Sequence, residues 1–536
     1  MLDNGTMING KKIDTPKSFQ VACTVTTQII AQVASSQFGG QSINGIDQIL
    51  APYVRKSYQK YLKQVLEEQE EIYHLNQPDL AAAIKIAQKR TKKEIKDGVQ
   101  TIQYQINTLM TTNGQSPFVT LFMHFDPEGE YAEEAAMITE EILKQRMEGV
   151  KDASGHFVTP AFPKLIYVLD EHNIYPDSKY YYLTELAARC SAKRMYPDHI
   201  SSKRMRKIYQ GNVFSPMGCR AFLTPWQDAN GEYQFDGRFN QGVVTINLPQ
   251  IAILSEKDEE KFFKLLDKRL EILKKALMVR HERLSKVTSD VSPIHWQDGA
   301  LARLKPGESI KPYLMDGYST LTIGYIGIYE SSMLVKGCSH TESEGKDFAM
   351  RIMAMLNQKK DEWTKETHVQ FAVYGTPAES LTHRFCDIDK KRFGSIPNIT
   401  DKGYYTNSYH VDVREKIDVF SKFHFEAEFQ EKSTGGMISY VEIPNMENNI
   451  PAILNIMEYI YDNIMYAEFN TRSDICHHCG FQGEIKVNED GDWECSKCHN
   501  TKREDLTVIR RTCGYLGENF WNEGRTKEIS ARVLHI

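Results

Sequence analysis

Four cysteines near the carboxyl end of the chain have the spacing of metal ligands. They form two CxxC pairs, Cys476 with Cys479 and Cys495 with Cys498, separated by fifteen residues. A two-residue gap lets both sulfurs of a pair reach one ion, and four thiolates complete a tetrahedral Zn²⁺ shell with no open position. The spacing therefore predicts a structural zinc ribbon and not a catalytic zinc site.

A glycine with a second chemical possibility follows these cysteines. The string RRTCGYLG occupies residues 510–517, close to the end of the sequence. A glycine in such a string usually marks a tight turn that requires a positive φ. Glycine can also lose one of its two α-hydrogens and leave a planar carbon radical, delocalised over the flanking amides, because no Cβ opposes that geometry. On the residues alone, a tight turn is the expected role of Gly514, and we interpret Cys513 as structural.

A single cysteine in mid-chain is flanked by turn-forming residues. Cys219 lies in SPMGCRAFL, residues 215–223, between Pro216 and Gly218 on one side and Arg220 on the other. This context predicts a loop tip and not the interior of a regular element. An isolated cysteine is usually a small buried hydrophobe. An S–H bond is comparable in strength to a glycyl C–H bond, so a hydrogen atom can pass almost reversibly between a cysteine thiol and a glycine α-carbon. Four other cysteines are expected to be buried apolar residues: Cys23, Cys190, Cys338 and Cys386.

The elements that must position these residues alternate between short apolar runs and amphipathic helices. The expected buried strands are 118–122, 165–169, 243–248, 321–328, 369–373 and 437–441, and helices are expected over 259–283 and 345–358. Such alternation over more than 400 residues predicts an α/β architecture. Two long charged helices, 54–72 and 81–106, precede it. They suit either a dimer surface or a solvated outer face.

Composition excludes several classes of protein. The 536 residues contain 65 Lys and Arg against 71 Asp and Glu, a net charge of −6, which argues against a generally basic nucleic-acid coat. No apolar run reaches the length of a membrane span, and the first residues lack the apolar core of a signal peptide. We therefore expect a cytoplasmic protein without a membrane partner. The length allows three or four domains or one large barrel.

The texture of the sequence changes near residue 471, where it becomes rich in Cys, Gly and Arg. We expect a catalytic domain over 1–465, with a finger-like loop near 215–222. A Cys₄ ribbon is expected over 466–505, and a terminal loop and tail over 506–536.

Taken together, RRTCGYLG after the Cys₄ motif and SPMGCRAFL in mid-chain resemble the glycyl radical loop and finger loop of anaerobic (class III) ribonucleotide reductases. The resemblance extends through most of the chain, including residues 18–42, 51–57, 107–120, 162–173, 237–252, 318–330 and 374–385. It implies a ten-stranded α/β barrel followed by the zinc ribbon and the radical loop. It also implies that Gly514 stores a radical and that Cys219, as a thiyl, takes the 3′ hydrogen of a ribose.

The same resemblance implies residues that bind substrate. Asn240, in FNQG, is expected to hydrogen-bond the ribose, with Asn247 as the competing choice, since an amide can both donate and accept. The run TPAES at 376–380 resembles a turn that cradles the triphosphate, through Thr376, Ala378, Glu379 and Ser380. An ordinary helix N-cap is the competing interpretation of this turn.

The cofactors and partners implied are those of an oxygen-sensitive radical enzyme of deoxyribonucleotide synthesis. They are structural Zn²⁺, a glycyl radical at Gly514 and formate as reductant, with a dithiol protein as the alternative reductant. A radical S-adenosylmethionine activating enzyme with an iron–sulfur cluster would generate the radical. Ribonucleoside triphosphates would be substrates, ATP and deoxynucleotides allosteric effectors, and the chain a homodimer, with the helices of 54–108 as the expected effector region.

The match departs from the family pattern at its start. Members usually have a first strand with a partner cysteine before an LDNGT-like segment, and many have an N-terminal ATP cone, whereas here Met1 opens that later segment. A truncated, catalytically impaired fragment is one explanation, and replacement of the missing thiol by Cys23 is another. A glycyl radical lyase or dehydratase would lack the Cys₄ motif. A zinc-ribbon nucleic-acid-binding protein would need a basic stripe; the tail has Arg503, Arg510, Arg511 and Arg525, but the whole chain is acidic.

Overall fold

The computed structural model describes residues 1–71, 79–112, 114–153, 155–218, 220–376, 378, 380–512, 514–518 and 522–536. It divides into two compact units, residues 1–190 with 289–306, and residues 191–288 with 307–536. Among the helices in the described part of the chain, none has the length and apolar character needed to cross a membrane.

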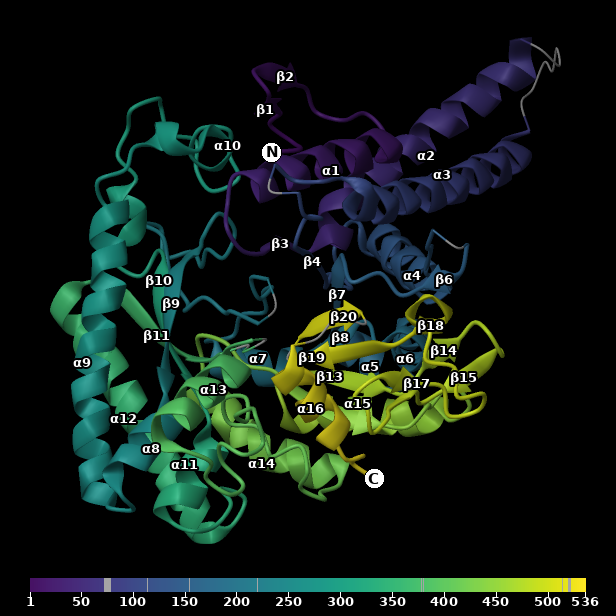
Figure 1. The fold of residues 1–536 in the computed structure, drawn as a ribbon. Coiled ribbons are helices and arrows are strands. Elements are labelled where there is room, and N and C mark those ends of the chain that lie inside the picture. Colours follow the sequence, from purple (N-terminus) through teal and green to yellow (C-terminus); the bar gives the residue numbers. More distant parts are fainter. Residues whose placement is uncertain are drawn as a thin grey trace. The chain divides into compact units, whose positions relative to one another are not determined.

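The first unit combines parallel strands with long helices (Figure 1). Strands β3 (Gln41–Asn44), β4 (Val119–Met123) and β7 (Lys164–Leu169) run parallel in that order. Two small hairpins, β1 (Thr6–Ile8) with β2 (Lys11–Ile13) and β5 (Val150–Lys151) with β6 (Phe157–Val158), are antiparallel. The helices are α1 (Phe19–Ser35), α2 (Ile46–Glu71), α3 (Leu80–Thr108), α4 (Ala132–Glu148), α5 (Glu171–Ile174), the start of α6 (Tyr181–Arg194), η1 (Ser289–Val291) and α10 (Pro293–Trp296).

The second unit contains the sheet that carries most candidate site residues. Strands β9 (Asn240–Asn247), β10 (Thr320–Ile326) and β11 (Gln370–Gly375) are parallel, with β10 in the middle. In a second sheet, β13 (Tyr466–Thr471) pairs with β12 (Ser439–Ile443) in parallel and with β8 (Asp198–Ser201) in antiparallel. The helices are α7 (Ser202–Ile208), α8 (Leu248–Ser255), α9 (Glu259–Leu284), η2 (Lys311–Leu314), α11 (Ile328–Val335), α12 (Ser343–Thr367), α13 (Leu381–Phe393), α14 (Val419–Lys432) and α15 (Ile450–Asn463).

The carboxyl-terminal part of the second unit consists of short strands and one helix, drawn in yellow in Figure 1. Strand β14 (Asp474–Cys476) lies between β15 (Phe481–Gly483) and β18 (Leu506–Thr507), and β16 (Lys486–Val487) pairs with β17 (Trp493–Glu494). After η3 (Arg503–Asp505), a hairpin of β19 (Ile509–Thr512) and β20 (Tyr515–Glu518) precedes the helix α16 (Glu523–Ala531).

The α/β class predicted from the apolar runs is confirmed, and each of the six expected strands is present with ends shifted by a few residues. Every residue of β4, β7 and β10 is buried, as expected of parallel strands covered on both faces. Helix α9 packs on β9, and α12 on β11. The buried residues of α9 recur at helical spacing, for example Phe262, Leu266 and Leu270.

The apolar residues of the charged helices face inward. In α3, Ile95, Val99, Ile102 and Ile106 are buried, and α3 packs against α1 and α2 of the same unit. Cys23 of α1 is fully buried beside Gly98 of α3, and this burial raises the pKa of its thiol. The predicted burial of Cys23, Cys190 and Cys386 is confirmed, whereas Cys338 is only half-buried.

Candidate active site

The β9–β10–β11 sheet presents a row of polar groups on one face. Asn240, the first residue of β9, donates from Nδ2 to Thr322 Oγ1 at 3.3 Å and accepts the Gly242 N–H at 2.8 Å. Thr322 and Gly324 lie two residues apart on β10, so their side-chain positions share a face. A Cβ at Gly324 would overlap the hydroxyls of Thr245 and Thr376, which are 3.0 Å apart. The glycine therefore leaves room for these two hydroxyls. We call this set of side chains the polar row: Asn240, Thr322, Thr245 and Thr376.

The competing residue, Asn247, is occupied by structural contacts. It is the N-cap of α8, where its Oδ1 accepts the Gln250 N–H at 3.2 Å. Its Nδ2 donates to Asp389 Oδ2 at 2.8 Å. An N-cap of this kind stabilises a helix by about 1 kcal/mol. Asn247 thus secures the junction of β9 and α8, whereas Asn240 lies at the start of β9 beside Thr322.

The predicted phosphate turn connects β11 to α13. Thr376 and Ala378 are buried, and Ser380 is the exposed N-cap residue of α13. Glu379 lies outside the described residues. The Ala378 N–H donates to Asn407 Oδ1 at 3.1 Å, and its carbonyl accepts from the Arg525 guanidinium of α16. The turn therefore lies at the carboxyl end of a parallel strand and the amino end of a helix, where ligands of α/β proteins commonly bind.

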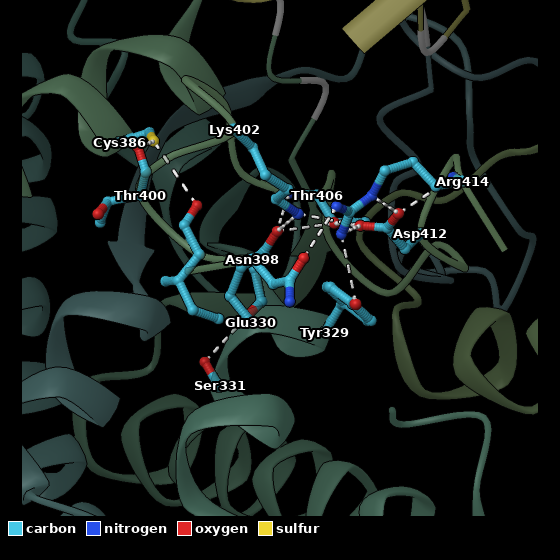
Figure 2. A network of polar contacts seen from close by, with 12 residues as sticks. Tyr329, Glu330, Ser331, Cys386, Asn398, Thr400, Lys402, Thr406, Asp412 and Arg414 are labelled. Carbon is cyan, nitrogen blue, oxygen red and sulfur yellow. Dashed lines mark hydrogen bonds and ion pairs between the residues drawn. The ribbon is translucent and has the colours of Figure 1, made fainter. Parts of the chain in front are cut away.

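A buried ion network holds the segment that supplies Asn407 (Figure 2). Lys402 Nζ lies 2.7 Å from Glu330 Oε1 and 2.9 Å from Asp412 Oδ2, and the Thr406 N–H and hydroxyl donate to the same Glu330 oxygen. Burial raises the pKa of Asp412, but Lys402 and Arg414 more than reverse this and lower it to about 2. All of these charges are compensated inside the unit.

Sequence reasoning missed this network. Its members come from α11 and from the irregular segment after α13, and they are residue types that are usually exposed. Charged residues dispersed among the aromatic residues of 402–414 were the only signal in the sequence.

The finger loop is attached to the carboxyl end of β11. Met217 and Ala221 exchange backbone hydrogen bonds of 2.7 and 3.3 Å, and Gly218 has a φ of +58°. The Phe222 N–H donates to the Gly435 carbonyl at 3.0 Å, and Gly436 in turn bonds to Gly375. Cys219 itself lies outside the described residues.

Gly514 is buried in the turn between β19 and β20. Its φ of +86° is in the region that glycine adopts without steric cost, and its N–H donates to Glu468 Oε1 at 3.2 Å. Glu468 is fully buried on β13, where its Oε2 lies 3.0 Å from the Arg511 guanidinium, which also pairs with Asp198. The expectation of a glycine turn is confirmed, and Cys513 lies outside the described residues.

The four predicted ligand cysteines converge. Their sulfur atoms all lie within 4.8 Å of one another, and the pairs Cys476–Cys498 and Cys479–Cys495 are each 3.7 Å apart. A tetrahedral ion with metal–sulfur bonds of about 2.3 Å requires sulfur separations of about 3.8 Å. The donor set therefore fits a tetrahedral thiolate-bound metal ion. His477 bonds instead to Thr507.

The cysteine cluster and the Gly514 hairpin are tied together by an ion pair. Asp474 of β14 forms a bidentate ion pair with the Arg510 guanidinium, whose Nη2 lies 2.7 Å from Asp474 Oδ2. The Asp474 carboxylate also accepts the Ile485 N–H at 2.8 Å. Arg510 also stacks on Trp493 at 5.3 Å. Arg510, Arg511 and Arg525 are buried in ion pairs, so they form no basic stripe for nucleic acid.

A family model described as anaerobic ribonucleoside-triphosphate reductase matches residues 1–535. The anaerobic ribonucleoside-triphosphate reductase of Enterobacteria phage T4 is 40% identical over 546 aligned residues, covering 100% of this chain and 86% of that protein. A solved anaerobic ribonucleotide reductase has a TM-score of 0.68 at 17% identity, covering 98% of this chain and 78% of the other. The Thermotoga maritima anaerobic ribonucleotide reductase in complex with dATP and CTP has a TM-score of 0.64 at 18% identity, covering 96% and 78%.

The likeness to the solved structures concerns the fold, and the whole-chain sequence match makes the protein an oxidoreductase enzyme. The chain belongs to the anaerobic ribonucleoside-triphosphate reductase family. This match supports the main interpretation of the sequence over a lyase, a dehydratase or a nucleic-acid-binding protein.

Proposed function

We propose that this protein reduces ribonucleoside triphosphates to deoxyribonucleoside triphosphates by a glycyl and thiyl radical mechanism. Gly514 stores the radical, and Cys219, after giving its hydrogen to Gly514, takes the 3′ hydrogen of the ribose. The 2′ hydroxyl then leaves as water. Formate supplies the two electrons and is oxidised to carbon dioxide, and the 3′ hydrogen returns from Cys219. Buried surroundings protect such intermediates from quenching by water.

The observation that carries this proposal is a shared face of β13. Tyr466 and Glu468 lie two residues apart on that strand, so their side chains point to the same side. The Tyr466 ring packs on Phe222, at the base of the finger loop, with centroids 6.0 Å apart. Glu468 accepts the Gly514 N–H. The flank of the thiyl loop and the radical glycine thus contact neighbouring residues of one strand, which supports hydrogen transfer between Gly514 and Cys219.

The polar row suggests how the substrate lies along the sheet. We place the ribose near Asn240, whose amide can both donate and accept, and the triphosphate toward Thr376, Ala378, Glu379 and Ser380 at the amino end of α13. The Thr245 hydroxyl lies 3.0 Å from the hydroxyl of Thr376. Hydroxyls, backbone N–H groups and a helix amino end all favour an anion.

We propose that the parallel strands belong to a ten-stranded α/β barrel and that residues 466–505 form a zinc ribbon, with Cys476, Cys479, Cys495 and Cys498 as the ligands. Zinc bound there would be structural, because four sulfurs leave no position for substrate. Its role would be to hold the ribbon against which Arg510 anchors the Gly514 hairpin.

The proposed partners are a radical S-adenosylmethionine activating enzyme and a second copy of the chain. We further propose ATP and deoxynucleotides as effectors, near α2 and α3, and a cytoplasmic location. The activating enzyme supplies the oxidising chemistry, and this chain binds substrate and shields the reacting atoms.

Anaerobic activation followed by electron paramagnetic resonance tests the proposal. A doublet signal is expected in the wild type and in Cys219→Ser, but not in Gly514→Ala, and reductase activity should be absent from both variants. Gly211→Ala is a matched control, because Gly211 has a similar φ of +87° with open space around it. Its signal should equal that of the wild type. A doublet that survives in Gly514→Ala would reject the radical site.

A further inference from the structure

A continuous chain of buried polar contacts runs from Gly514 to the proposed phosphate turn. It begins with the Gly514 N–H on Glu468 and continues through the 3.0 Å pair of Glu468 with Arg511. The Arg511 carbonyl then accepts from Arg532 Nη1 at 2.8 Å. This first half connects the hairpin turn to the residue that follows α16.

The second half passes along α16. Arg532 bonds to both carboxylate oxygens of Glu528, at 3.1 and 3.2 Å, and Glu528 Oε2 lies 2.8 Å from Arg525 Nη1. The other terminal nitrogen of Arg525 donates to the Ala378 carbonyl. Positions 525, 528 and 532 fall at helical spacing, so one side of α16 bridges the two features.

Burial makes this chain of contacts sensitive to any break. Arg525 is 3% exposed and Glu528 4% exposed. Burial raises the pKa of Glu528, but Arg532 and Arg525 more than compensate and hold it below its usual range. A buried ionised group that loses its partner is strongly unfavourable, so breaking one of these ion pairs destabilises the charged groups next to it. Displacing the hairpin removes the Arg511 end of this chain of contacts.

Ala378 is held by hydrogen bonds on both sides of its Cα. Its N–H bonds to Asn407, and its carbonyl bonds to Arg525. The N–H belongs to the peptide before the Ala378 Cα and the carbonyl to the peptide after it, so the two bonds together fix the backbone at Ala378. One of these bonds comes from Asn407, the residue after Thr406 of the network in Figure 2, and the other comes from the helix that follows the radical hairpin.

We infer that Arg525 is a positioning residue through which the seating of the Gly514 hairpin controls the affinity of the 376–380 turn for a nucleoside triphosphate. The inference rests on the proposed function of that turn. Coupling of this kind is reciprocal, so a triphosphate bound at the turn also stabilises the seated hairpin. The enzyme would then hold substrate tightly only while the radical glycine is enclosed.

Binding of cytidine triphosphate to the full-length, unactivated protein tests the inference. Arg525→Gln should weaken binding about tenfold, the size expected for losing one charged hydrogen bond. Lys527→Gln is the matched control, since it removes the same charge from an exposed position on α16 and should bind like the wild type. Arg525→Lys keeps the charge without the forked geometry and should weaken binding to a similar degree. Arg525→Lys is the variant to test if Arg525→Gln fails to fold.

Hydrogen exchange separates coupling from a general loss of structure. Cytidine triphosphate should slow amide exchange of residues 509–518 in the wild type and in Lys527→Gln, but not in Arg525→Gln. Equal protection in Arg525→Gln, or wild-type affinity in that variant, would overturn the inference. If Thr376→Ala and Ser380→Ala also bind like the wild type, the phosphate turn itself is wrong. If those two weaken binding and Arg525→Gln does not, only the coupling is wrong.

Discussion

The backbone N–H of Gly514 donates to the buried carboxylate of Glu468 at 3.2 Å, and the same carboxylate pairs with Arg511. The Glu468 carboxylate therefore accepts a hydrogen bond from the turn and pairs with a charged residue of the strand that leads into the turn. Asp198 provides a second carboxylate to Arg511, so ion pairs as well as packing hold the hairpin in place.

Glu468→Gln should loosen the hairpin. The substitution leaves Arg511 with one carboxylate in a buried site, so we expect the free energy of unfolding to fall by about 1–3 kcal/mol. Urea titration and limited proteolysis within 509–518 would measure the change. Glu428→Gln is the control, because Glu428 forms a half-exposed pair with Lys346 and should cost less than about 1 kcal/mol. Equal losses in both variants would show that Glu468 has no special role.

Metal analysis tests the cysteine cluster. The purified protein is expected to contain one zinc per chain, and Cys476→Ser should lose it, because three thiolates with one hydroxyl bind Zn²⁺ more weakly. Cys338→Ser, which changes a half-buried cysteine outside the cluster, should keep its metal. Unchanged zinc in Cys476→Ser would contradict the ligand assignment. Because Arg510 joins the ribbon to the hairpin, metal loss should also increase proteolysis near Gly514.

The sequence allowed prediction of the parts that depend on local pattern. Buried parallel strands are apolar on both faces, and β10 is recognisable for that reason. The CxxC pairs are recognisable because two ligands from one tight turn have a fixed spacing. The helical spacing of apolar residues likewise located α3 and α9.

The charged contacts that position the site were not predictable in this way. Arg511 contacts Asp198 and Glu468, which are distant in sequence, and nothing in RRTCGYLG separates a buried arginine from a solvated one. Lys402 forms an ion pair with Glu330 only because α11 and the segment after α13 come together in the fold. Such pairs depend on tertiary packing and are not encoded by local pattern.

Gly324→Ala should selectively impair substrate binding. A methyl group there would overlap the hydroxyls of Thr245 and Thr376 and push them out of the polar row. We expect the KM for ribonucleoside triphosphates to rise about tenfold or more, with little change in the glycyl radical signal, because the hairpin is untouched. Steady-state kinetics on activated enzyme would measure this. Gly337→Ala, whose added Cβ would meet nothing within 4 Å, should keep the wild-type KM. An unchanged KM in Gly324→Ala would remove the polar row from the substrate site.

Acid stability should depend on Glu442. Burial raises its pKa, but Arg532 and Arg472, with a hydrogen bond from Asn470, more than reverse this and lower it from 4.5 to about 2. The folded state therefore binds fewer protons than the unfolded state between those values. The stabilisation is complete above pH 4.5 and is lost as the pH falls toward 2, by at most about 1.4 kcal/mol per pH unit.

Glu442→Gln removes that proton from both states, so its unfolding free energy should vary less steeply with pH below 4.5. The nearby His535 acts in another window. Burial lowers its pKa from 6.5 to about 3, so it also costs stability as the pH falls, but from pH 6.5 downward. Urea titrations from pH 7 to pH 3 would resolve the two. The variant should follow the slope of the wild type above pH 4.5 and diverge from it below. Parallel curves throughout would show that Glu442 is not held ionised by its arginines.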